Sequence, residues 1–190
     1  MKSNYIHLVM GISSAGKSIY IKSKQDSGEW KGIPLLMAYQ IGTDFSAEIL
    51  QQECIVHYNL FRPYNNDVVN VENDLFEDKA LSLLLKYNDR IKVSLLVTRP
   101  AVLTKRILQR TEVEPILIKR GGYYPQQKIA ELLCHLDMNQ FHEKWINLLQ
   151  EFQINFTILN SETDKYPIIS ADNLTTFFHV EQKSHIKDFS

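Results

Sequence analysis

The octapeptide Gly11-Ile-Ser-Ser-Ala-Gly-Lys-Ser18 fits the pattern G-x-x-x-x-G-K-[ST] at every required position. The apolar residues 5–10 come before it, and a segment compatible with a short helix, from Lys17 to about Gln25, comes after it. The apolar run is rich in strand-forming residues and ends abruptly at Gly11, which predicts a strand buried on both faces. The sequence therefore predicts a strand, a tight glycine turn and a helix in direct succession.

The residue types in this turn suit a polyphosphate ligand. Gly11 and Gly16 allow backbone dihedral angles that other residues avoid, so the chain can approach phosphate oxygens closely. Successive N–H groups then point inward as an anion nest, to which the following helix adds the positive end of its dipole. Lys17 supplies a positive charge for the β- and γ-phosphates, and the Ser18 hydroxyl is a hard oxygen ligand for Mg²⁺.

Apolar runs and helical segments alternate along the rest of the chain. Further strands are expected at residues 34–41, 54–60, 91–97 and 155–159. Helices are expected at about 42–52 (with Asp44 or Ser46 as the cap), 74–87, 100–111, 123–136 and 138–152. The last ~20 residues are expected to form a short strand or helix and a polar tail. This βαβ rhythm predicts an α/β fold, a three-layer αβα domain over residues 1–190 with a five-stranded, mainly parallel sheet. Chemistry is then expected at the carboxyl ends of the strands.

Composition narrows the class of protein. With 190 residues, 44% hydrophobic and 23% charged, the chain has the balance of an ordinary globular domain. The net charge of -1 argues against binding long nucleic acid by bulk electrostatics. Cys54 and Cys134 have no disulfide-like or metal-like spacing, and neither a signal peptide nor a membrane span is recognisable. We expect a reduced, cytoplasmic protein that has no membrane partner.

A strand that runs directly into G-x-x-x-x-G-K-[ST] in a short chain resembles the P-loop kinases of small molecules, which include shikimate, gluconate, adenylylsulfate and nucleotide kinases. The resemblance implies a P-loop nucleoside triphosphate hydrolase fold, ATP and Mg²⁺ as cofactors, and a small-molecule acceptor. It also implies that the triphosphate is held by Gly11, Ser13, Ser14, Ala15, Gly16, Lys17 and Ser18. It covers most of the chain in the order of elements, although only the glycine turn is a sharp match.

A basic segment follows the fourth expected strand. Residues 99–120 contain six basic and two acidic residues, a charge of +4 that leaves -5 for the rest of the chain. In the kinases that the chain resembles, a lid with the pattern L-x-x-R-x-x-x-R follows this strand, and Leu103, Arg106 and Arg110 match that pattern. The resemblance implies that Arg106 and Arg110 stabilise the transferring phosphoryl group, in a lid at about residues 99–124. A solvated basic helix face is the alternative.

Candidate acceptor residues follow the second and third strands. Asp44 occupies a place where the resembling family has an acidic acceptor residue, so it is predicted to act as a base or to hold a metal-bound water, with helix capping as the alternative. The third strand ends with Asn59 where these kinases often have an acidic residue, and the side-chain carbonyl of Asn59 is a candidate to hold a metal-bound water. His57 shares a strand face with Asn59. Arg62 is a candidate clamp for an anionic acceptor. Core packing for His57 and a surface charge for Arg62 remain alternatives.

Together these observations favour an ATP-dependent phosphotransferase that acts on a hydroxyl or phosphate of a small metabolite. A GTPase switch is disfavoured because neither D-x-x-G nor N-K-x-D occurs in an appropriate place. A nonenzymatic or regulatory nucleotide-binding protein and a sulfotransferase-like P-loop protein remain open. Residues 160–163, Asn-Ser-Glu-Thr, follow the fifth strand, where the resembling kinases contact the nucleotide base.

Overall fold

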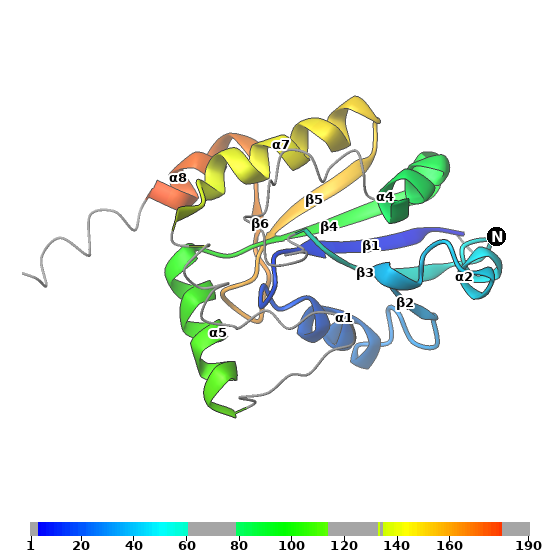
Figure 1. Cartoon of the computed structure of the whole chain (residues 1–190), viewed down its shortest axis with the longest axis horizontal. Coiled ribbons are helices and arrows are strands. Elements are labelled where there is room, and N and C mark those ends of the chain that lie inside the picture. The colour runs from blue at the N-terminus through cyan, green and yellow to red at the C-terminus, as the bar shows by residue number, and fades with distance from the viewer. Residues whose placement is uncertain (1–3, 61–78, 114–132, 134, 180–190) are drawn as a thin grey trace, which may run out of the picture.

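The described part of the chain, residues 4–60, 79–113, 133 and 135–179 of the computed structural model, is built around one six-stranded sheet (Figure 1). The order of the strands is β2-β3-β1-β4-β5-β6, so that β1 lies between β3 and β4. β1 to β5 run parallel, and β6 pairs antiparallel with β5. The strands are β1 Ile6–Gly11, β2 Leu35–Met37, β3 Cys54–Asn59, β4 Ile91–Val97, β5 Asn155–Asn160 and β6 Ile168–Ile169.

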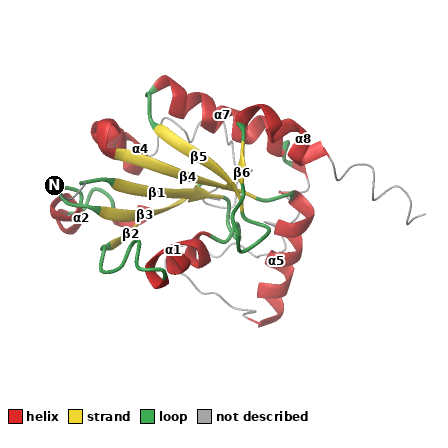
Figure 2. Ribbon diagram, turned by 180° about the vertical axis from the view of Figure 1, so that it is seen from behind, coloured by secondary structure: helices red, strands yellow, loops and turns green. Residues whose placement is uncertain are grey.

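Helices cover both faces of this sheet and lie at both of its ends. Figures 1 and 2 show α1 on one face, α7 and α8 on the other, and α5 across the end where β4 finishes. α2 lies at the opposite end, near the start of β1. The helices are α1 Lys17–Asp26, α2 Asp44–Ile49, α4 Lys79–Leu84, α5 Pro100–Val113, α7 Met138–Glu151 and α8 Leu174–His179, with 3-10 turns η1 Ala38–Gln40, η2 Leu85–Arg90 and η3 Ala171–Asn173. The arrangement is the predicted three-layer αβα sandwich.

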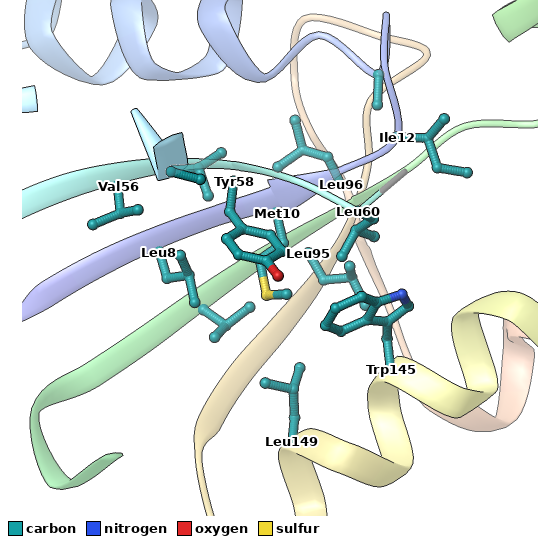
Figure 3. Close-up of a cluster of buried hydrophobic side chains, with 14 of the residues drawn as sticks. Leu8, Met10, Ile12, Val56, Tyr58, Leu60, Leu95, Leu96, Trp145 and Leu149 are labelled. Carbon is teal, nitrogen blue, oxygen red and sulfur yellow. The ribbon is translucent and has the colours of Figure 1, made fainter. Parts of the chain in front are cut away.

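The core between the sheet and α7 fixes the orientation of β3. Figure 3 shows Tyr58 of β3 pointing toward Trp145 of α7. The two rings pack edge to face, with their centroids 6.0 Å apart. Leu8, Met10, Leu95 and Leu149 complete this apolar cluster. Because successive side chains of a strand point to opposite faces, burying Tyr58 against α7 leaves His57 and Asn59 on the face that α1 covers. The predicted shared face of these two residues is confirmed.

Two titratable side chains are buried in the core as packing groups. His142 of α7 donates from Nδ1 to the Met138 carbonyl oxygen at 2.7 Å and stacks on Phe178, and its burial lowers its pKa to about 4. Burial raises the pKa of Cys54 to about 11, so its thiol stays protonated and inert. Cys134 lies outside the described residues.

The region around β2 differs from the sequence-based expectation. The predicted strand at 34–41 is only Leu35–Met37, because the chain turns into η1, where the Gln40 side chain accepts a hydrogen bond from the Met37 N–H at 2.7 Å. The cap of α2 is Thr43, whose hydroxyl accepts a hydrogen bond from the Ser46 N–H, so the prediction of Asp44 or Ser46 as the cap is wrong. Asp44 is instead the first helical residue, where its charge favours the helix dipole.

Other boundaries differ less. The described sheet gains a sixth strand, β6, which is too short to stand out in the sequence. The helix expected at 74–87 is described only from Lys79, and it changes to a 3-10 turn at Leu85. The helix expected at 123–136 lies almost entirely outside the described residues. Among the helices that the structure describes, none has both the length and the apolar character that crossing a membrane requires.

Candidate active site

The glycine turn connects β1 to α1 at the end of the sheet that α5 crosses (Figure 1). Gly11 is packed against β4 so closely that a Cβ atom would lie 3.0 Å from the Leu96 carbonyl oxygen. Ser14 and Gly16 both have positive φ, at 65° and 85°, and the Ala15 N–H closes the turn by donating to the Ile12 carbonyl at 3.1 Å. The predicted compact turn is present and Gly16 has the expected positive φ, but Gly11 does not: it is the last residue of β1, and its lack of a side chain serves the close packing against Leu96 instead.

The start of α1 is suited to an anion. Its N-cap residue is Gly16, so no side chain caps the helix, and the first turn of a helix contains N–H groups that have no intrahelical partner. A helix N-terminus of this kind attracts a phosphate through its N–H groups and its dipole.

Lys17 is folded onto the turn. Its side chain is 4% exposed, and its Nζ donates to the carbonyl oxygens of Gly11 and Ile12, each at 2.8 Å, and to Asn59 Oδ1 at 3.2 Å. These oxygens compensate the cost of burying an ammonium group. The turn thus holds a positive charge at its centre, and β3 contributes to holding it there.

Ser18 is next to β3 as well. Its Oγ is 3.4 Å from His57 Nε2, while the residue as a whole is exposed. The register of the parallel β1–β3 pair, Val9 opposite His57 and Gly11 opposite Asn59, brings both β3 side chains to the start of α1. Asn59 thereby contacts Lys17, and His57 contacts Ser18.

Arg106 approaches the turn from α5. Its Nη1 is 3.4 Å from the Ser14 carbonyl oxygen and 3.9 Å from the position that a Cβ on Gly16 would occupy. Its Nη2 donates to the Ser161 carbonyl at 2.7 Å. Leu103 and Ile107, both fully buried, hold this part of α5 in place. Arg106 therefore lies beside the glycine turn, and its role in stabilising a transferring phosphoryl group stays a prediction.

An ion pair holds Arg99, the residue directly before α5. Glu162 accepts hydrogen bonds from Arg99 Nε at 2.8 and 3.0 Å and from the Arg99 backbone N–H at 2.9 Å. Its carboxylate is 9% exposed; burial raises its pKa, but the hydrogen bonds from Arg99 outweigh burial and hold the pKa below its usual value. A negative charge at the start of α5 also stabilises the helix dipole.

The remaining predicted residues are not brought to the turn by the described structure. Asp44 begins α2, which lies at the opposite end of the sheet (Figure 2), so its role as a base stays a prediction that its placement disfavours. Arg62 lies outside the described residues. Arg110 follows Arg106 by one turn of α5, but its side chain lies outside what the structure describes, as does the predicted lid beyond residue 113.

Sequence reasoning missed the partnership of Arg99 with Glu162. These residues are 63 positions apart, and they meet because β4 and β5 are parallel neighbours that end at the same edge of the sheet. The available signal was an acidic residue two positions after β5 and a basic residue two positions after β4. Residues 160–162 also hold Arg106 through the Ser161 carbonyl.

These residues fit a nucleoside triphosphate that carries a divalent cation. The turn combines a helix start without a side-chain cap, the Lys17 ammonium and the Arg106 guanidinium. Ser18 offers an exposed oxygen ligand beside it. Across the described ranges no three His, Cys, Asp or Glu side chains are grouped to hold a metal ion, so phosphate and water would have to supply most of its ligands.

Comparisons with known proteins support the fold. No family model and no curated protein matches the chain. A chain from the PezAT chromosomal toxin-antitoxin system of Streptococcus pneumoniae is similar over 96% of this chain and 82% of its own, with a TM-score of 0.52 and 14% identity.

Two further solved structures have lower TM-scores. The YorR protein of Bacillus subtilis, in complex with phosphorylated GDP, is 15% identical to this chain. The match covers 95% of this chain and 98% of the YorR chain, with a TM-score of 0.44. The shikimate kinase of Bacteroides thetaiotaomicron is 11% identical to this chain. The match covers 91% of this chain and 95% of the shikimate kinase, with a TM-score of 0.41. The chain therefore has a three-layer αβα fold with the glycine turn between β1 and α1, and its similarity to the PezAT chain supports this fold. Similarity at these identities identifies a fold, so the reaction is inferred from the site.

Proposed function

We propose that this protein is an ATP-dependent phosphotransferase, which moves the γ-phosphoryl group of ATP to a hydroxyl or phosphate of a small metabolite in the cytoplasm. The observation that carries the proposal is the place of Arg106, whose guanidinium comes from a separate helix and lies beside Gly16 and the Ser14 carbonyl. Lys17 and the start of α1 would account for phosphate binding without phosphoryl transfer. A second cation near the terminal phosphate is needed when charge develops there during transfer.

Each residue at the turn has a distinct part in this reaction. The backbone around Gly16 and the first turn of α1 would bind the phosphates, and Lys17 would exchange its carbonyl partners for the β- and γ-phosphate oxygens. Ser18 Oγ would hold Mg²⁺, which when bound neutralises phosphate charge. Ser161 accepts a hydrogen bond from Arg106 of α5, and residues 160–163 would contact the base, as the resemblance implies.

During transfer, an oxygen of the acceptor forms a bond to the γ-phosphorus while the bond from that phosphorus to the β-γ bridging oxygen breaks, and ADP leaves. Arg106, with Arg110 as a proposed second cation, would stabilise the charge on the equatorial oxygens through planar, bidentate hydrogen bonds. In a loose transition state the acceptor loses its proton late. The proposal therefore does not depend on Asp44 as the base.

Acceptor-dependent release of ADP tests the proposal. The purified protein is incubated with ATP and Mg²⁺ and with panels of sugars, nucleosides, hydroxy acids and their phosphates. At least one acceptor is expected to raise ADP release above the ATPase background, and Lys17→Ala is expected to abolish the increase. ATP binding without acceptor-dependent release would support a regulatory nucleotide-binding protein, and binding restricted to nucleoside bisphosphates without metal would support a sulfotransferase-like protein.

A further inference from the structure

Two side chains at the end of β3 lie beside the residues that would bind the nucleotide and its metal ion in the proposed function. The sequence supplies His57 and Asn59 on the face that α1 covers, and no carboxylate at either position. Each contacts one of two consecutive residues at the start of α1: Asn59 Oδ1 lies 3.2 Å from Lys17 Nζ, and His57 Nε2 lies 3.4 Å from Ser18 Oγ. An imidazole nitrogen is therefore next to the hydroxyl that faces the metal in the proposed function.

The geometry of this pair suits two ligands of one ion. In an octahedral site, neighbouring ligands that are each about 2.1 Å from the metal lie roughly 3 Å apart. The separation of 3.4 Å between Ser18 Oγ and His57 Nε2 exceeds that value by only a few tenths of an ångström. Ser18 is exposed and His57 is half-buried, so a side-chain rotation of Ser18 can close the difference.

The position of His57 is set by the fold. Tyr58, the next residue, is 1% exposed and packs against Trp145 on the other face of the sheet, and β3 is paired with β1 on one side and β2 on the other. A strand held in this way keeps its alternating side chains in place, so the imidazole is directed toward α1 before any ligand arrives.

The chemistry of the two donors differs from that of an all-oxygen site. Mg²⁺ prefers oxygen ligands, whereas imidazole nitrogen binds first-row transition metals more readily, with affinities that rise from Mn²⁺ onward. We propose that His57 Nε2 and Ser18 Oγ together ligate the divalent cation that enters with the nucleotide, so that the site favours Mn²⁺ relative to Mg²⁺ more than an all-oxygen site does. The inference rests on the proposed binding of a nucleoside triphosphate at the turn.

Pulsed electron paramagnetic resonance of the Mn²⁺–ATP complex with the full chain tests this inference. A directly bound imidazole adds a ¹⁴N coupling to the Mn²⁺ signal. We expect that coupling in the wild-type protein and in His179→Gln, which makes the same chemical change at an exposed residue at the end of α8. We expect it to disappear in His57→Gln and in His57→Asp.

Affinity provides a second readout that does not depend on turnover. The ratio of Mn²⁺–ATP to Mg²⁺–ATP affinity, measured by calorimetry, is expected to fall about tenfold in His57→Gln, while metal-free ATP binds within a factor of about two of wild type. In His57→Asp an oxygen ligand replaces the nitrogen, so metal dependence returns without the preference for Mn²⁺.

Two negative results are distinguishable. Mn²⁺–ATP that binds the wild-type protein without a ¹⁴N coupling, or with a coupling that persists in His57→Gln, would overturn the inference and leave the phosphotransferase proposal intact. A wild-type protein that binds ATP neither with nor without metal would overturn both.

Discussion

Arg106 Nη2 donates a hydrogen bond to the Ser161 carbonyl at 2.7 Å, which ties α5 to the segment that follows β5. The same guanidinium reaches the glycine turn through the Ser14 carbonyl. One side chain thus contacts both the proposed phosphate site and the segment proposed to contact the base. Binding of a nucleotide would change the partners of Arg106 on both sides.

Arg106→Ala is expected to lower the rate of phosphoryl transfer about 10³-fold, because a cation that stabilises the transferring group acts mainly in the transition state. ATP affinity is expected to change far less. Steady-state kinetics on the best acceptor, together with ATP calorimetry, separates the two effects. Lys105→Ala, an exposed neighbour on α5, is the matched control and should behave as wild type. A rate for Arg106→Ala within a few-fold of wild type would contradict the assignment.

Glu162→Gln is expected to reduce the free energy of unfolding by about 1–3 kcal/mol, since it weakens hydrogen bonds between a carboxylate that is largely buried and Arg99. The lowered pKa of Glu162 means that its stabilisation is present above the unfolded-state pKa and is lost as the pH falls through the folded-state pKa. Urea unfolding as a function of pH measures both effects.

The control is Glu29→Gln, which removes the solvent-exposed pairing with Lys24 and should lower the free energy of unfolding by less than about 0.5 kcal/mol. Equal losses of unfolding free energy in the two variants would show that the Arg99–Glu162 pair stabilises the protein no more than an exposed ion pair does.

Alanine at the two glycines of the turn is expected to have different consequences. Gly11→Ala places a methyl group against the Leu96 carbonyl and the Ala15 side chain, and it should cost about 1–3 kcal/mol of stability. A methyl group at Gly16 meets Arg106 only at 3.9 Å, so the cost there comes from the φ of 85°, about 1–2 kcal/mol, and from distortion of the phosphate-binding backbone. Urea unfolding should show that Gly11→Ala lowers the free energy of unfolding more than Gly16→Ala does. ATP calorimetry should show that, for each unit of stability lost, Gly16→Ala loses more ATP affinity than Gly11→Ala does. The reverse order would contradict the described turn.

His142 predicts a specific acid sensitivity. Its pKa is about 4 in the folded protein and near 6.5 when unfolded, so protonation favours the unfolded state. The contribution of neutral His142 to the free energy of unfolding is fully present above about pH 6.5. As the pH falls from about 6.5 to about 4, the free energy of unfolding decreases by on the order of 3 kcal/mol. His142→Leu should flatten the dependence of unfolding free energy on pH in this window, whereas His179→Leu, at an exposed residue, should not. An unchanged slope in His142→Leu would show that another group titrates there.

Local sequence signals determined most of the framework. The strand at Ile91–Val97 has the predicted bounds, and the turn between β1 and α1 has the predicted form, because buried apolar runs and glycine patterns are read from neighbouring residues. The shared face of His57 and Asn59 followed from the period of a strand.

Features that depend on tertiary contacts were not predictable in the same way. The Arg99–Glu162 pair and the Arg106–Ser161 hydrogen bond join residues at least 55 positions apart, which meet only once β4 and β5 are paired. The early end of β2 at Met37 and the capping by Thr43 instead of Asp44 depend on single hydrogen bonds that compete with a regular pattern.

Titration calorimetry of ATP with Mg²⁺ into wild-type protein and Lys17→Ala tests the phosphate-binding turn most directly. Lys22→Ala, an exposed lysine on the same helix, is the matched control, and urea unfolding verifies that each variant is folded. We predict that wild type and Lys22→Ala bind ATP with equal affinity and that Lys17→Ala binds at least about tenfold more weakly, because its ammonium lies at the centre of the turn. ATP binding that is equally strong in folded Lys17→Ala, or absent from the wild-type protein, would contradict the account.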